Sequence, residues 1–219
     1  MNLDSAKWVV GVDYTAAPTC ATCHMGATRN QDSTHNVGER ISWTNRPPIS
    51  VRPEVMDAKM GLESANLKWD DRRDNMQDVC KACHTETYVE QFYQQYDSMI
   101  ELYNEKFAKP GKALYGAAKP LLKKAKFSNK LDWIWFELWH HEGRRARMAT
   151  SMMAPDYTHW HGTYDLAKHF YTKMVPELES LIYKGKKAGG KKKKAAKKLQ
   201  KELDKVLNSK NHKWYLGKK

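Results

Sequence analysis

The sequence predicts an all-α fold in which a loop-rich N-terminal part precedes long helices. Apolar residues recur at helical steps of three and four through much of residues 89–183, and no segment shows a convincing strand pattern. Of the 219 residues, 41% are apolar, and they include 8 Trp and 11 Tyr. That content can bury a substantial core, so we expect one or two folded domains.

We expect helices over four segments: residues 89–107, 114–126, 131–148 and 164–183. Pro110-Gly111 should stop the first helix, and Pro176 should kink the last one. Residues 1–75 contain several prolines and no sustained apolar period. We expect that part to form loops that are ordered mainly by wrapping a bound group.

The motif C-x-x-C-H occurs twice and uses every cysteine of the chain. The copies are Cys20-Ala21-Thr22-Cys23-His24 and Cys80-Lys81-Ala82-Cys83-His84. Two thiols at this spacing can form thioethers to the vinyl groups of one porphyrin, and the adjacent histidine then lies below the iron. A four-cysteine zinc site would use the same thiolates but would not explain a histidine at the same place twice. The sequence predicts two covalently bound haem c groups, with His24 and His84 as proximal iron ligands.

The sixth ligand of each iron decides between electron transfer and catalysis. Seven further histidines are available, and His35, His140 and His141 are the first candidates for distal metal ligands. Adjacent helical residues point about 100° apart, so only one of His140 and His141 can face a given iron. Methionine is the alternative, although methionines more often fill cores. We expect bis-histidine ligation of both irons.

The excess positive charge lies at the C-terminal end. Residues 184–219 hold fifteen lysines and two acidic residues, so their net charge is +13, the same as that of the whole chain. We expect Lys184–Lys194 to be a solvated linker or arm, followed by a short amphipathic helix through Leu199 and Leu203. A solubilising end, docking onto an acidic partner and attraction to anionic lipid all remain open, and nucleic acid is the least favoured partner. The expected regions are 1–86 for haem attachment, 87–183 for helices that supply distal ligands, and 184–219 for the tail.

Haem attachment also bears on location, because it takes place outside the cytoplasm. We expect a periplasmic or equivalent lumenal protein. The first twenty residues lack an apolar signal-peptide core, so we expect that a leader has been removed or omitted. No run approaches about 18 apolar residues, so no transmembrane segment is expected.

Five segments together resemble a known family. They are Ala17–Met25, Thr34–Gly38 with Ile41–Pro48, Met76–His84, Leu138–Arg147 and Met152–Gly162. In combination and order these segments resemble the last two haem modules and the helical C-terminal region of octahaem hydroxylamine oxidoreductases. The likeness covers roughly residues 19–183.

The resemblance implies haem loops followed by long helices, oligomerisation through those helices, and hydroxylamine, hydrazine or nitrite chemistry at a separate catalytic haem. The chain departs from that family because it holds two attachment motifs and no motif for a catalytic haem. Tyr157 or Tyr164 lies in the stretch where family members place a tyrosine that cross-links to a neighbour's catalytic haem. The resemblance thus implies the small subunit of a complex with an octahaem partner, and an anammoxosome location if the source is an anaerobic ammonium oxidiser.

Three functions compete at this point. The first is a non-catalytic electron-transfer subunit that relays electrons between the octahaem partner and a soluble electron carrier, because the sequence holds no recognisable catalytic constellation. The second is a small cytochrome enzyme with one open iron that acts on nitrite or hydroxylamine. The third is a free dihaem shuttle whose lysine-rich tail docks onto an acidic partner.

Overall fold

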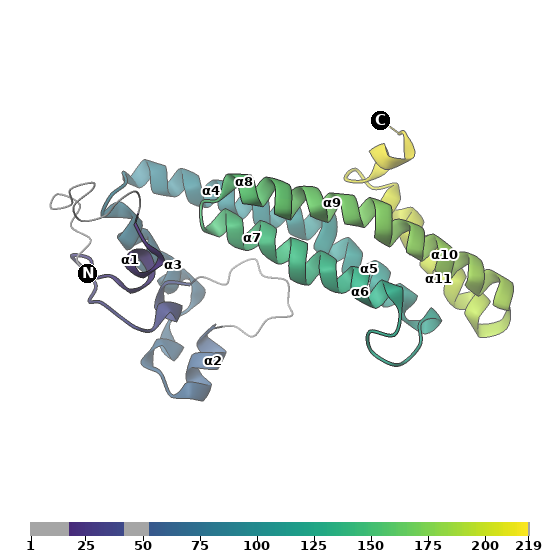
Figure 1. Cartoon of the computed structure of the whole chain (residues 1–219), viewed down its shortest axis with the longest axis horizontal. Coiled ribbons are helices and arrows are strands. Elements are labelled where there is room, and N and C mark those ends of the chain that lie inside the picture. The colour runs from purple at the N-terminus through teal and green to yellow at the C-terminus, as the bar shows by residue number, and fades with distance from the viewer. Residues whose placement is uncertain (1–17, 42–52, 219) are drawn as a thin grey trace. The chain divides into compact units, whose positions relative to one another are not determined.

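A computed structural model describes residues 18–41 and 53–218 (Figure 1). Within those residues the chain folds into helices joined by turns and loops, without strands, which confirms the predicted all-α class. The chain divides into two compact units, residues 1–97 and residues 98–219. Each unit has its own internal organisation, so the two are described in turn.

The first unit holds both attachment motifs. Its elements are α1 (Cys20–Met25), η2 (Val37–Arg40), α2 (Pro53–Met60), η3 (Glu63–Asn66), α3 (Trp69–Lys81) and most of α4 (Glu86–Tyr103). The prediction of loops up to residue 75 was wrong for α2 and for the start of α3. The sequence pattern missed α3 because its buried residues are Arg72 and Val79 rather than an apolar stripe.

The Arg72 guanidinium organises the first unit from a fully buried position. Its Nη2 lies 2.9 Å from Asp57 Oδ2, and it also donates to the Ser64 carbonyl at 2.5 Å. Nη1 donates to the Gly38 carbonyl at 2.5 Å, and Nε donates to the Leu67 carbonyl at 3.1 Å. A buried charge is tolerated when it is paired and hydrogen-bonded in this way. Arg72 therefore ties α2, η2 and η3 to α3.

In the second unit, the helix that begins as α4 does not stop at Pro110. It passes through the π turn η4 (Asn104–Ala108) into α5 (Lys109–Ala118) and ends in η5 (Lys119–Leu121). The π turn shifts the hydrogen-bond register just before Pro110, which becomes the second residue of a new helical segment, where a missing N–H is tolerated. The expected break at Pro110-Gly111 and the separate helix over 114–126 are thus corrected.

The next two helices contain the remaining predicted segments, 131–148 and 164–183, and extend beyond both. The first of them is α6 (Lys130–Phe136), the π turn η6 (Glu137–Glu142) and α7 (Gly143–Ser151). The second is α8 (Pro155–Tyr157), the π turn η7 (Thr158–Tyr164), α9 (Asp165–His169), the π turn η8 (Phe170–Met174) and α10 (Val175–Ala188). Pro176 again stands second in a segment that follows a π turn. The two helices approach closely at Gly162, where an added Cβ would lie 2.6 Å from Ala146 Cα.

The lysine-rich segment is a helical hairpin, which corrects the expected linker. After α10 the chain turns at Gly189, whose φ is +72°, and continues as α11 (Gly190–Leu207) alongside α10 (Figure 1). The buried face of α11 presents Ala196, Leu199 and Leu203. This apolar stripe packs against α5 and α10, so the lysines can remain on the outside of an ordered helix.

One apolar core holds the second unit together. Phe107 packs edge-on against Phe170 at 5.5 Å between ring centroids, and the Tyr171 hydroxyl lies 2.8 Å from His212 Nδ1. His212 is buried and precedes the last turn, η9 (Lys213–Leu216), so the C-terminal end is attached to the same core. None of the helices within the described residues is both long and apolar enough to span a membrane.

Candidate haem attachment site

The first motif forms the short helix α1. Thr19 caps it: the Thr22 backbone N–H donates to Thr19 Oγ1 at 3.3 Å, and the Thr19 N–H donates to Thr22 Oγ1 at 3.2 Å. This reciprocal capping box fixes the start of the helix at Cys20. Residues three and four apart on a helix are neighbours, so Cys20, Cys23 and His24 lie on one side of the turn.

His24 is in the state that iron ligation requires. Burial, followed by the charge of Arg40, holds the pKa of His24 below its usual value, which favours the neutral imidazole. Its Nδ1 is buried and has no hydrogen-bond partner among the described residues. The residue fits the role of proximal ligand, which stays a prediction.

The second motif lies at the C-terminal end of α3. Cys80 is in the last turn, and the His84 N–H donates to the Cys80 carbonyl at 2.9 Å. The His84 ring is exposed and stacks on Tyr88 at 4.4 Å between centroids. An exposed imidazole beside an aromatic ring is accessible to a porphyrin.

No disulfide joins the four cysteines, all of which lie in the described residues. Burial, followed by the charge of Cys23, raises the pKa of Cys80 to about 11, and burial followed by the charge of Cys83 raises the pKa of Cys23. Thiols that affect each other in this way lie near one another, and α1 also contacts α3. The two motifs, sixty residues apart in sequence, are thus brought together within one unit.

Asp78 joins the two motifs. It lies on α3 two residues before Cys80 and accepts hydrogen bonds from Thr28 Oγ1 at 2.6 Å, Asn30 Nδ2 at 2.5 Å and Gln31 Nε2 at 2.7 Å. Burial alone would raise the pKa of Asp78, but these hydrogen bonds lower it below its usual value. The loop that follows the first motif is therefore held on the helix that carries the second.

Arg40 holds the same loop through three further hydrogen bonds. Its side chain is 2% exposed and donates to the Cys23 carbonyl at 3.0 Å, to Gln31 Oε1 at 3.3 Å and to the Asp32 carbonyl at 3.4 Å. Sequence reasoning missed Arg40 and Asp78, because ordinary charged residues in a polar stretch give no signal of burial. Only Asp78 lies next to a motif, two residues before Cys80.

His35 lies in the same unit as both motifs. It is exposed, in a loop that returns to the end of α1 through a hydrogen bond of 3.0 Å from the Thr34 N–H to the Met25 carbonyl. Its assignment as a distal ligand stays a prediction. Residues 1–97 contain three histidines, so His35 is the only one in this unit besides the two motif histidines.

His140 and His141 lie in the second unit, on the π turn η6. The His140 ring is half-buried and stacks on Phe136 at 4.4 Å, whereas His141 is exposed. Burial, followed by the charges of Arg144 and His141, lowers the pKa of His140 and so favours a neutral ring. Its Nδ1 is buried without a hydrogen-bond partner in the described part of the chain. Both residues also stay predictions as distal ligands.

The tyrosines singled out by the family resemblance are exposed. Tyr157 is 45% exposed, and its ring centroid lies 4.9 Å from that of His161. Tyr164 is 49% exposed, and its ring centroid lies 5.7 Å from that of Trp160. All four side chains lie on or next to the π turn η7. Either tyrosine is thus available to a partner.

The comparisons with known proteins agree with the attachment motifs. Residues 5–110, slightly less than half of the chain, match the family described as seven times multi-haem cytochrome CxxCH, and the match includes both motifs. The chain has no significant match among curated proteins or among solved structures. The helical fold, the paired motifs and the family match support a multihaem c-type cytochrome, a class that binds haem covalently and transfers electrons.

Proposed function

We propose that the chain is a dihaem c-type cytochrome that transfers electrons as a subunit of a complex with an octahaem hydroxylamine oxidoreductase-like enzyme. One observation carries the electron-transfer part of the proposal. The two C-x-x-C-H motifs lie together in the first unit, with the loop after Cys23 fixed through Asp78 to the helix that carries Cys80. Two haems attached there would be neighbours.

The protein's own residues have three tasks in this proposal. Cys20, Cys23, Cys80 and Cys83 would attach the two groups, and His24 and His84 would hold the irons. When bound, haem c supplies an iron that accepts and releases one electron. Because Cys20, Cys83 and His84 are exposed, both attachment sites reach the surface of the unit, where a redox partner can approach.

Support for the octahaem partner comes from the family resemblance and from the exposed face of η7. Support for a soluble electron carrier comes from α11, whose outward lysines form a basic surface. That surface consists of exposed lysines at positions 191, 192, 193, 194, 197, 198 and 201. A basic surface of this kind raises the rate at which an acidic partner docks. An extracytoplasmic location is part of the same proposal, because that is where haem c is attached.

The proposal is tested with holo-protein made in a host that matures c-type cytochromes. Native mass spectrometry with an octahaem hydroxylamine oxidoreductase-like protein should show a complex, and stopped-flow absorbance should show electron exchange between the two. Free dihaem protein in every mixture, with no electron exchange, would contradict the subunit proposal.

A second function is favoured by one observation. The first unit offers only His35 as a spare histidine for two irons, so one iron lacks a distal histidine from its own unit. If the second unit or a partner supplies none, that iron is open and can bind nitrite or hydroxylamine. Addition of either compound to reduced holo-protein should then shift the Soret band, and an unchanged spectrum would remove this function.

A further inference from the structure

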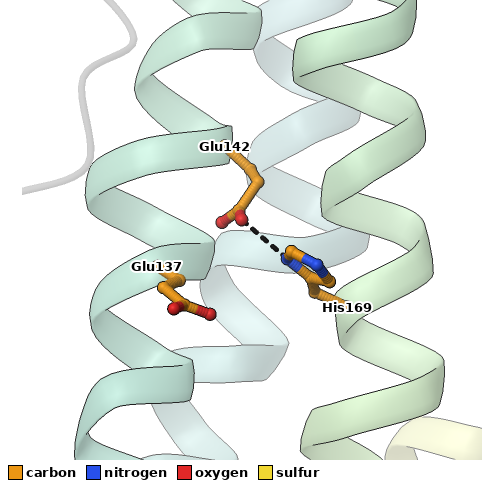
Figure 2. A group of neighbouring side chains, drawn as sticks. All are labelled: Glu137, Glu142 and His169. Carbon is orange, nitrogen blue, oxygen red and sulfur yellow. Dashed lines mark hydrogen bonds and ion pairs between the residues drawn. The ribbon is translucent and has the colours of Figure 1, made fainter.

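A group of metal-ligating side chains lies in the second unit, apart from the haem motifs. Figure 2 shows Glu137 and Glu142 on one helix and His169 on the neighbouring helix, with their polar ends converging. One ligand atom from each residue lies within 4.8 Å of the other two. A single ion can therefore contact all three residues.

The π turn η6 builds this arrangement. Glu137 and Glu142 are its first and last residues, five positions apart. On a regular α-helix, residues five apart point about 140° away from each other. A π turn repeats from residue i to residue i+5 and brings such residues toward one face. Both carboxylates therefore face α9, which carries His169, and π turns of this kind are frequent at functional sites.

The state of Glu142 indicates a missing ligand. Its side chain is 5% exposed, and Oε1 lies 2.6 Å from His169 Nδ1. The other oxygen, Oε2, is fully buried and has no hydrogen-bond partner among the described residues. A buried carboxylate oxygen without a partner is costly, and structures seldom leave one unless an ion or a water satisfies it.

A second unsatisfied oxygen lies close by. The Tyr103 hydroxyl is buried without a hydrogen-bond partner in the described residues, and it lies against Gly143, the residue next to Glu142. A phenol hydroxyl can donate a hydrogen bond to a water or an oxygen ligand in this space.

The donor set and its access favour a transition metal. Two carboxylates and one imidazole suit Zn²⁺ and its first-row neighbours, whereas Ca²⁺ and Mg²⁺ prefer oxygen ligands alone. Glu137 is 40% exposed, so an ion can enter from solvent. The Lys173 ammonium lies 3.4 Å from Glu137 Oε2 and is itself 43% exposed, so an incoming ion can displace this long contact.

We propose that Glu137, Glu142 and His169 bind one divalent first-row transition-metal ion, which links the α6–α7 helix to α9. Bound there, the ion would satisfy the free oxygen of Glu142 and stabilise the second unit. This site is independent of the proposed electron-transfer function, because it uses none of the residues assigned to the haems.

Calorimetric titration of the full-length holo-protein with Zn²⁺ tests the proposal. We expect one equivalent to bind and the apparent Tm of the second unit to rise. Glu142→Gln and His169→Gln should each raise the Kd for Zn²⁺ at least about tenfold and abolish the rise in Tm. Glu137→Gln should also raise the Kd, and because this side chain is 40% exposed, the substitution removes a ligand without disturbing the core.

Two matched controls separate this site from surface binding. Glu105 is an exposed helical glutamate paired with Lys109, and His159 is an exposed histidine on η7. Glu105→Gln and His159→Gln should leave the Kd unchanged. Failure of the wild-type protein to bind Zn²⁺, or the same Kd for the wild type and all three site variants, would overturn the proposal.

Discussion

The Thr28 hydroxyl donates a hydrogen bond of 2.6 Å to the Asp78 carboxylate, across fifty positions of sequence. Thr28 follows the first haem-attachment motif and Asp78 precedes the second, so this contact connects the two. Asn30 and Gln31 donate to the same carboxylate, at 2.5 Å and 2.7 Å. Asp78 is therefore a shared acceptor that helps hold the first motif's loop on the helix that carries the second.

Replacement of Asp78 by alanine should destabilise the first unit. The variant leaves three side-chain donors without their shared acceptor, and hydrogen bonds to a charged group contribute about 1.5–3 kcal/mol each at most, with strong non-additivity. We expect the free energy of unfolding to fall by about 1–3 kcal/mol in urea titration. Asp74→Ala, at an exposed position of the same helix, should cause little change.

The contribution of Asp78 should also depend on pH. Its folded-state pKa is lowered from the ordinary 3.8, so its stabilisation is present above that value and is lost as the pH falls through the lower folded-state pKa. The difference in stability between the wild type and Asp78→Ala should be constant near neutral pH and should shrink in strong acid. A difference that grows toward acid pH would contradict this sign.

Breaking the buried ion pair of Arg72 and Asp57 should lower the free energy of unfolding more than Asp78→Ala does. Asp57→Ala leaves the fully buried guanidinium without its 2.9 Å ion-pair partner, which should cost about 3–5 kcal/mol of unfolding free energy. The double variant D57A/R72M removes both charges and should lose less than the sum of the two single variants. Additive losses in denaturant titration would show that the two charges do not act as a pair.

Ligation by His35 can be read from the spectrum of the reduced protein. If His35 closes one iron, His35→Ala opens it, and carbon monoxide should then shift the Soret band of that haem. His159→Ala, which removes an exposed histidine of the second unit, should give the same carbon monoxide response as the wild type. An identical response of the wild type and His35→Ala would exclude His35 as a ligand.

Two glycine variants test the packing of the second unit in opposite directions. Gly162→Ala would place Cβ 2.6 Å from Ala146 Cα and 2.9 Å from Ala146 Cβ, so we expect a loss of about 1–3 kcal/mol in unfolding free energy. Gly116 lies in α5 with no atom within 4 Å of an added Cβ. Gly116→Ala should therefore raise stability by about 0.5–1 kcal/mol, because alanine is the better helix former.

The sequence predicts the fold class, because that class depends on local patterns. Helices over residues 131–148 and 164–183 follow from apolar spacing, whereas the two haem sites stay a prediction from a five-residue motif. The break expected at Pro110 did not occur, since a π turn just before it changes the register of the helix. A local rule for proline cannot anticipate such a bulge.

The features that the sequence did not predict depend on tertiary packing. Lys184–Lys194 looks too polar to fold, yet Gly185 is buried against Ala196 and the hairpin forms around that contact. In the same way, Glu142 and His169 are 27 residues apart and meet only because a π turn rotates one helix face toward the other. Nothing in the local sequence distinguishes this glutamate from an exposed one.

The intact mass of the mature chain tests the central claim most directly. After expression in a host that matures c-type cytochromes, we predict a mass equal to the polypeptide plus two covalently attached haems. The double variant C80A/C83A should retain one haem, and C20A/C23A should retain the other. A wild-type mass with one haem or none, together with thiols that still react with an alkylating reagent, would contradict the assignment of a dihaem cytochrome.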